Sequence, residues 1–267
     1  MLRVPQPYAY RSGRSADAEV DYCVAELRDA IARRATGTPP ALIMEPVQGN
    51  GTQLDFPERF YREVREVCTE HGILLIFDEV QTGFGRTGKM WAAEHYGVTP
   101  DILVFGKGVG GGFPLAGVLC RSELAGFQPG DDALTFGEFP VSLAAGLAAL
   151  QVLERDGLLQ ACTEMGKYAT DGLLAMQPRH RLIGDIRGPG LLIGVELVRD
   201  QQTREPAAAE TLEVYRRALD LGVIFGTTKY AGLGNVLKIK PPFTITRAQM
   251  DRVLDVLDQV LTAIESR

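Results

Sequence analysis

A lysine, Lys107, and two acids, Glu45 and Asp78, each follow a short apolar run of this sequence. Such runs are typical of buried strands, and polar residues at the carboxyl ends of parallel strands commonly face a ligand. An amine and a carboxylate mounted in this way could face one small molecule from two sides. They could equally form a structural salt bridge at the rim of the sheet. Spacing alone leaves both interpretations of the Asp78 and Lys107 pair open.

The segment around Lys107 favours the chemical interpretation, because Gly106–Pro114 is largely glycine. Glycine is used where the backbone must approach a ligand closely or adopt a positive φ. A lysine held in such bare surroundings can lose part of its hydration, which makes its neutral amine available as a nucleophile. An amine of this kind forms a Schiff base with an aldehyde cofactor, and this is the chemistry that we expect of Lys107.

The segment Gly106–Pro114 matches two phosphate-binding motifs only in part. Its glycines have the spacing of the dinucleotide-binding fingerprint, but that motif must open a helix, and Pro114 with the strand-like run after it argues against one. A Walker A loop is excluded because Lys107 is followed by Gly108 and Val109 and by no serine or threonine.

The apolar runs alternate with helical patterns, which predicts an α/β fold with a mostly parallel sheet. The strands are apolar along their whole length, as in sheets that helices cover on both faces. The pattern changes near residue 170, so we predict a large domain at 1–170 and a small α+β domain at 171–267. An extended arm is expected before residue 16. Helices are predicted at 16–34, 57–70, 141–174 with a break at Gly157, 207–221 and after Thr246, and strands at 41–44, 73–77, 102–105, 115–120, 183–198 as a hairpin, and 236–239.

Composition and charge narrow the class of protein. The 267 residues carry a net charge of -6 and show no basic face of the kind that binds nucleic acid. The cysteines lie far apart and the histidines lack metal-binding spacing, so we expect reduced core thiols and no metal site. The N-terminus lacks the apolar core of a signal peptide, and no apolar stretch is long enough for a membrane span. We therefore expect a cytoplasmic protein.

Longer motifs resemble those of class III (omega-type) pyridoxal-phosphate-dependent aminotransferases. They are Glu45-Pro46-Val47-Gln48-Gly49, the stretch FDEVQTGFGRTG from Phe77 to Gly88, Pro100-Asp101-Ile102, and Gly106-Lys107-Gly108. Their order and spacing also agree, and the similarity runs from at least Ala41 to the C-terminus. The resemblance implies the fold type I of pyridoxal-phosphate enzymes, here as an incomplete large domain plus a small C-terminal domain. It also implies pyridoxal 5'-phosphate as the cofactor.

The resemblance gives a role to each matching residue. Lys107 would carry the cofactor as a Schiff base and later move the proton between substrate and cofactor. Asp78 would pair with the pyridine nitrogen, which makes the ring an electron sink. Val80 would pack on one face of the ring, and Gln81 would hydrogen-bond its phenolic oxygen. Without the resemblance, Val80 would be interpreted as an ordinary core residue and Gln81 as a surface turn residue.

Thr135 is implied as a ligand of the cofactor phosphate in the neighbouring subunit. Its segment, LTFGEFP, is similar to the family pattern T-F-G-G-N-P but departs from it at Glu138 and Phe139. The alternative is an ordinary loop threonine. The resemblance therefore implies a homodimer with shared active sites.

Two departures from the family bear on the substrate. Lys238 stands where many members have an arginine that binds the substrate carboxylate in bidentate fashion, and a lysine does not reproduce that planar fork. Asn50 stands where several members have an acid that pairs with that arginine. We therefore expect altered recognition of ordinary α-amino acids, with Glu45 and Lys238 on the substrate side.

Family members also have an N-terminal portion with a phosphate-binding loop and a stacking aromatic ring, and residues 1–40 show neither. We expect weak cofactor binding and little activity from this chain alone. The expected function is transfer of an amino group from an amine or amino acid to a keto acid. The alternatives are a lyase acting on a phosphorylated amine, a decarboxylase, and, from another class, an inactive fragment or non-catalytic subunit.

Overall fold

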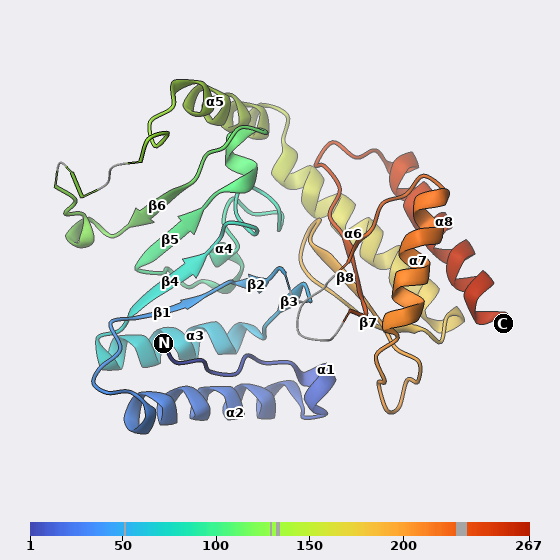
Figure 1. Ribbon diagram of the computed structural model, residues 1–267, viewed down its shortest axis with the longest axis horizontal. Helices are drawn as coiled ribbons and strands as arrows, with labels where there is room; N and C mark the ends of the chain where they lie inside the picture. Colours follow the sequence, from blue (N-terminus) through green and yellow to red (C-terminus); the bar gives the residue numbers. More distant parts are fainter. Residues whose placement is uncertain (51, 129, 132–133, 228–233) are drawn as a thin grey trace. The chain divides into compact units, whose positions relative to one another are not determined.

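The computed structural model describes residues 1–50, 52–128, 130–131, 134–227 and 234–267 (Figure 1). Contacts between residues divide the chain into two compact units. Unit 1 comprises Met1–Pro46, Phe56–Gly85 and Lys89–Asp156, and unit 2 comprises Val47–Asp55, Arg86–Gly88 and Gly157–Arg267. The last change of unit along the chain falls between Asp156 and Gly157. The predicted domain boundary near residue 170 stays a prediction.

Unit 1 is built on a four-stranded sheet with the strand order β1-β4-β5-β6. Strands β1, β4 and β5 are mutually parallel, and β6 pairs with β5 in the antiparallel direction. The mostly parallel sheet is therefore confirmed. The strand bounds are β1 (Ala41–Met44), β4 (Leu74–Asp78), β5 (Ile102–Phe105) and β6 (Gly117–Cys120).

The helices of unit 1 lie close to their predicted positions. Helix α3 follows Pro57 and ends before Gly72, whose φ of 67° is the left-handed conformation that closes many helices. The predicted extended arm was wrong in one respect, because it contains a one-turn helix that Gly13 closes with φ 74°. The bounds are α1 (Ala9–Ser12), α2 (Ala16–Asp29) with a π-helical end (Ala30–Arg34), α3 (Glu58–His71), α4 (Ala93–Tyr96) and α5 (Pro140–Arg155).

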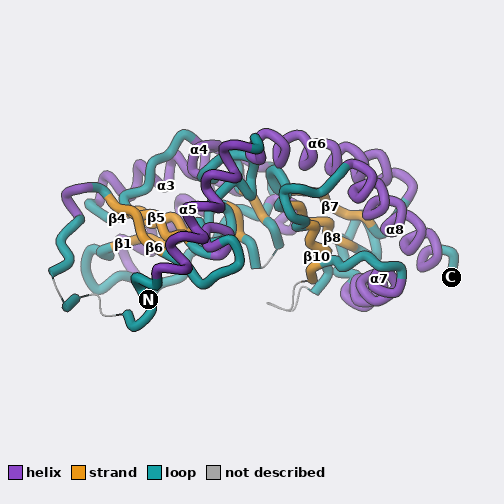
Figure 2. The backbone as a smooth tube through the Cα atoms, turned by 90° about the horizontal axis from the view of Figure 1, so that it is seen from above, coloured by secondary structure: helices purple, strands orange, loops and turns teal. Residues whose placement is uncertain are grey.

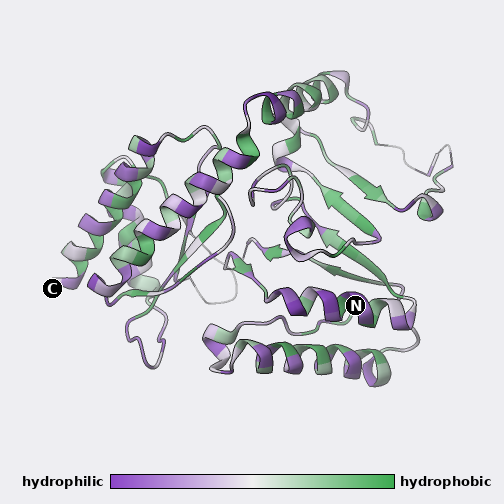
Figure 3. Cartoon of the chain, turned by 180° about the vertical axis from the view of Figure 1, so that it is seen from behind, coloured by the Kyte–Doolittle hydropathy of each residue, from purple (hydrophilic) through white to green (hydrophobic). Residues whose placement is uncertain are grey.

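One face of this sheet is covered more fully than the other. In β4, Leu75 and Phe77 have no exposed surface, whereas the alternate residues Leu74 and Ile76 are half-buried. Ile43, which pairs with Ile76, is 62% exposed. The strands are apolar along their length (Figure 3). The prediction that helices cover both faces therefore holds for only one face within the described residues.

Unit 2 contains a second sheet, antiparallel throughout, with the order β7-β8-β10-β9. The predicted hairpin, the strand at 236–239 and the final helix are all present. Residues 228–233, which come before that strand, lie outside the described residues. The bounds are β2 (Val47–Gln48), β3 (Leu54–Asp55), β7 (Ile183–Arg187), β8 (Ile193–Leu197), β9 (Gly226–Thr227), β10 (Val236–Ile239), α6 (Leu158–Met176), α7 (Ala208–Asp220) and α8 (Arg247–Glu265).

The core of unit 2 is one continuous apolar cluster between this sheet and its helices. Figure 2 shows α6, α7 and α8 gathered around β7, β8 and β10. Every residue of β8 is buried, as expected for a central strand. Helix α8 begins with a capping box in which Thr246 and Gln249 satisfy each other's backbone N–H groups.

The cysteines follow the prediction in three cases out of four. Cys23, Cys68 and Cys162 are buried free thiols, whereas Cys120 is an exposed one because it ends the edge strand β6. Within the described ranges, no three His, Cys, Asp or Glu side chains gather in a way that could hold a metal ion. Over the same ranges, no helix combines the length and the apolar character needed to cross a membrane.

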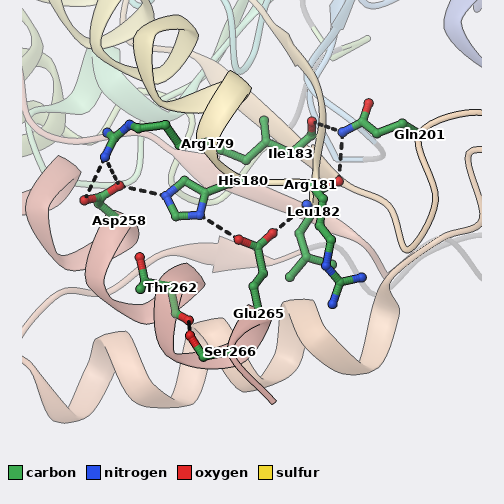
Figure 4. Close-up of polar contacts among 10 residues, drawn as sticks. All are labelled: Arg179, His180, Arg181, Leu182, Ile183, Gln201, Asp258, Thr262, Glu265 and Ser266. Carbon is green, nitrogen blue, oxygen red and sulfur yellow. Dashed lines mark hydrogen bonds and ion pairs between the residues drawn. The ribbon is translucent and has the colours of Figure 1, made fainter.

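His180 is enclosed between two carboxylates of α8 (Figure 4). Its ring Nδ1 lies 2.8 Å from Glu265 Oε2, its Nε2 lies 2.7 Å from Asp258 Oδ1, and its side chain is 3% exposed. The other oxygen of Glu265 accepts the N–H of Leu182 at 2.8 Å. Both ring nitrogens lie within hydrogen-bond distance of a carboxylate oxygen, so the ring bridges the two acids. His180 thus fastens the segment after α6 to the C-terminal helix.

Replacing His180 by glutamine should lower the free energy of unfolding by about 2–4 kcal/mol, because the amide cannot reproduce both ring contacts and leaves one of the two carboxylates without its hydrogen bond. The measurement is urea unfolding of both proteins. His71→Gln, the same change at an exposed histidine, is the control and should stay within about 0.5 kcal/mol of the parent. Equal stability of the parent and the His180 variant would contradict the role assigned to the cluster.

The same cluster predicts acid sensitivity. The hydrogen bond from His180 holds the pKa of Asp258 below its ordinary value of 3.8, although burial opposes this. A carboxyl group whose pKa is depressed by folding stabilises the fold above pH 3.8, and this contribution is lost as the pH falls through the folded-state pKa. The parent protein should therefore lose stability below pH 3.8 more steeply than Asp258→Asn in thermal unfolding. Parallel curves for the two proteins would show that this carboxylate does not link folding to pH.

Candidate active site

The three predicted polar residues follow the three parallel strands of unit 1. Strand β4 lies between β1 and β5, and Asp78 is the register partner of Val104 in β5. Because parallel strands end at the same edge of a sheet, Asp78 and Lys107 lie at the ends of neighbouring strands. Glu45 lies one strand further, directly after β1.

Lys107 has a backbone conformation that lysine rarely adopts. Its φ is 50°, and it begins a single 3-10 turn, Lys107–Gly110, after an extended Gly106. A positive φ in a residue other than glycine costs about 1–3 kcal/mol and is concentrated at functional sites. The residue is exposed, so the described part of the chain does not supply the desolvation that we expected around its amine.

Small residues allow the Lys107 turn to pack against its neighbours. A Cβ at Gly106 would lie 3.5 Å from Cγ1 of Val80 and 3.4 Å from Cβ of Ala116. On the other side, a Cβ at Gly146 of α5 would lie 3.2 Å from the carbonyl oxygen of Val109. Val80 thus lies beside Gly106, the residue that precedes Lys107. Helix α5 packs closely against the turn at Val109.

Asp78, Val80 and Gln81 form the turn at the end of β4, and all three are half-buried. The N–H of Val80 donates to Oδ1 of Asp78 at 3.0 Å. This hydrogen bond fixes the plane of the carboxylate. Strand pairing and the Gly106 contact therefore bring Asp78, Val80 and the Lys107 turn together. Gln81 belongs to the same turn.

Glu79 is a residue of this turn that sequence reasoning missed. Its side chain has no exposed surface and accepts three hydrogen bonds, from the hydroxyl of Thr82 and from the N–H groups of Ala92 and Ala93. Burial raises the pKa of Glu79, and these hydrogen bonds act in the opposite direction. The sequence shows an acid directly after Asp78 at the end of an apolar run, but not its burial or its hydrogen-bond partners.

The remaining predicted residues lie in two places. Thr135 is exposed in a turn before α5, in unit 1. Lys238 is buried in β10 of unit 2, where its Nζ donates to the carbonyl oxygen of Asn50 at 2.8 Å. The two positions that depart from the family pattern are therefore in direct contact.

Comparison with known proteins gives the same family as the motifs. The model of the class III aminotransferases matches residues 1–261, and the chain belongs to this family. Its members have the fold type I architecture and use pyridoxal 5'-phosphate, so the predicted family, fold class and cofactor are confirmed.

The relatives differ in the reaction that their names describe. The chain is 38% identical over 224 residues to an acetylornithine aminotransferase of Caldanaerobacter subterraneus, covering 84% of this chain and 54% of the relative. It is 42% identical over 226 residues to a leucine/methionine racemase of Thermococcus litoralis, covering 84% and 50%. A Bacillus anthracis aminotransferase structure matches with a TM-score of 0.91 and 32% identity, covering 97% of this chain and 61% of that one. The chain thus spans about half the length of the curated relatives it matches.

The residues at the strand ends fit the cofactor of the family. Lys107 offers a primary amine for an aldehyde, and Asp78 offers an acceptor for a protonated ring nitrogen. Val80 offers an apolar surface close to both. The glycine before Lys107 leaves room that a side chain would take, because a Cβ there would already touch Val80.

Proposed function

We propose that this chain carries the lysine side of the active site of a pyridoxal-phosphate-dependent aminotransferase, which moves an amino group from an amine or amino acid to a keto acid. The observation that carries the proposal is the placement of Asp78 and Lys107 at the ends of adjacent parallel strands in a chain of this family. The cofactor, when bound, supplies an electron-poor ring that takes up the electrons left when the substrate loses its α-proton.

Lys107 has two tasks in this proposal. Its Nζ would hold the cofactor at the aldehyde carbon, and as a free amine it would take the proton from the substrate's α-carbon and deliver it to that carbon of the cofactor. Lys107 begins its turn two residues after Phe105, the last residue of β5, which supports this role. An exposed amine at that position is accessible to both cofactor and substrate.

Asp78 would keep the proton on the ring nitrogen by offering a negative charge beside it. Val80 N–H donates to its Oδ1, and the ring nitrogen would donate to Oδ2. Val80 would offer its isopropyl group to the ring, and the side-chain amide of Gln81 would donate to the phenolic oxygen. These roles follow from the family motif and from the arrangement of the turn.

Thr135 is assigned to the cofactor phosphate across a homodimer. Its turn carries large apolar side chains that are exposed, with Leu134 at 72%, Phe136 at 77% and Phe139 at 41%. Apolar side chains gathered on one surface segment are typical of interfaces. A partner subunit that covers this segment would bring Thr135 to the neighbouring site.

On the substrate side we assign Glu45 and Lys238. A buried lysine that already donates to a backbone carbonyl is a point charge and offers no planar fork to an α-carboxylate. This favours amines, or amino acids held by another group, as donors. A lyase acting on a phosphorylated amine or a decarboxylase would use the same cofactor residues. A racemase is a further candidate, because a racemase relative shares 42% identity and racemisation begins with the same proton removal.

Borohydride reduction of the purified protein with excess pyridoxal phosphate should fix the cofactor on the peptide that contains Lys107, as measured by mass spectrometry. Lys107→Ala should abolish this adduct, and Lys89→Ala, at another exposed lysine of unit 1, should not. Asp78→Asn should weaken cofactor binding about 10- to 100-fold, the effect of one charge-assisted hydrogen bond. A folded protein without an adduct at Lys107 contradicts the proposal and favours a non-catalytic chain.

Lys238→Arg should shift the donor preference toward α-amino acids by about 10- to 100-fold, because a guanidinium can bind the α-carboxylate through two charge-assisted hydrogen bonds. The measurement is the single-turnover rate at which an α-amino acid and a simple amine each change the cofactor's absorption spectrum. Lys240→Arg, two residues further along the chain, is the matched control. An unchanged ratio of the two rates would remove Lys238 from the substrate site.

A further inference from the structure

The fully buried carboxylate of Glu79, the residue between Asp78 and Val80, accepts three hydrogen bonds. Glu79 Oε2 accepts the hydroxyl of Thr82 at 2.6 Å and the N–H of Ala92 at 2.9 Å, and its Oε1 accepts the N–H of Ala93 at 2.8 Å. Burying a carboxylate costs several kcal/mol unless such donors satisfy it. Because an amide could accept through only one oxygen, this arrangement requires an acid.

The main chain of Glu79 is fixed as firmly as its side chain. Its N–H donates to the carbonyl oxygen of Val104 at 2.8 Å, and its carbonyl accepts the N–H of Gly83 at 2.9 Å. Val104 is the residue of β5 that pairs with Asp78. Glu79 therefore ties the end of β4 to the neighbouring strand through its backbone, and to the start of α4 through its carboxylate.

The loop that this carboxylate closes is filled by aromatic rings. The ring of Trp91 would lie 2.8 Å from a Cβ at Gly83, and its centroid is 4.9 Å from that of Phe84. Phe84 in turn lies 5.5 Å from the ring of Phe105, the last residue of β5. The turn after β4 and the strand that leads to Lys107 are thus packed into one body.

We propose that Glu79 is a positioning residue of the active site: it touches neither substrate nor cofactor, and it fixes the orientation of Asp78 by tethering their shared turn. The roles of Asp78 and Lys107 rest on the proposed function, whereas the tether is a property of the chain itself. Without the carboxylate, the turn would lose its tether to the start of α4, and the orientation of Asp78 would be less restrained.

The hydrogen bond from Val80 N–H to Asp78 Oδ1 is a direct reporter of this orientation in the cofactor-free protein. In Glu79→Gln the side-chain NH2 would face donors, so at least one of the three hydrogen bonds would be lost. Amide hydrogen exchange of Val80, Ala92 and Ala93 should then accelerate about tenfold or more, as for local opening of a hydrogen-bonded loop. Trp91 is the only tryptophan of the chain, and its fluorescence should report the same loosening.

Glu94→Gln is the matched control. Glu94 is exposed and accepts the N–H of Trp91 at 2.8 Å in the same loop, so its change should leave the exchange of Val80 unaltered. Thr82→Val removes a single donor to Glu79 and should give a smaller change in the same direction. If Glu79→Gln does not fold, hydrogen exchange at Val80 in Thr82→Val tests the positioning role of Glu79 instead.

With pyridoxal phosphate bound, the pH midpoint of the cofactor's absorption band should shift in Glu79→Gln and not in Glu94→Gln, because that band responds to the charge held beside the ring. Faster exchange at Ala92 and Ala93 with unchanged exchange at Val80 would overturn the proposal, since the tether would then be structural only. Failure of the parent protein to form the Lys107 adduct would sink the proposed function, and exchange at Val80 would still decide the role of Glu79.

Discussion

The parallel pairing of β4 with β5 is the constraint on which the candidate site depends. Its register, Asp78 opposite Val104, sets the carboxylate and the Lys107 turn at the same edge of the sheet. A slip of one residue would send Asp78 to the opposite face, because side chains alternate along a strand. Asp101 holds the other end of the pairing, since its Oδ2 accepts the N–H of Leu75 at 2.7 Å. The register is thus fixed at both ends of the two short strands. Two residues from separate strands can bind one ligand only if this register is constant.

The alternation of β4 also separates two acids that are adjacent in the chain. Leu75, Phe77 and Glu79 have no exposed surface, whereas Leu74, Ile76 and Asp78 are half-buried. The covered face thus receives the acid that needs protein donors, and the more open face receives the acid that a ligand can reach. Asp78 and Glu79 are thus both acids, but Glu79 accepts from protein donors and Asp78 faces the more open side. Burial raises the pKa of Glu79, which is tolerable only because three donors point at it.

Much of the fold could be predicted because its signals are local. The bounds of β5 and β10, the break at Gly157 and the ends of α3 follow from apolar runs, glycine and proline. The partners of buried charges could not be predicted in this way. Glu79 bonds to residues thirteen and fourteen positions later, and His180 to residues 78 and 85 positions later. The sequence shows the charge, whereas only tertiary packing shows what satisfies it. The exposure of Cys120 likewise depends on β6 being an edge strand.

The contact between Lys238 and Asn50 explains how two departures from the family can coexist. Lys238 donates to the backbone carbonyl of residue 50, and every residue type supplies that acceptor. An acid at position 50 is therefore not required for this contact, and asparagine there leaves it intact. Where the resemblance implies an arginine paired with an acid side chain, this chain has a lysine bound to a backbone carbonyl. Because the backbone acceptor does not vary, a difference in substrate preference should follow the residue at position 238 rather than the one at position 50.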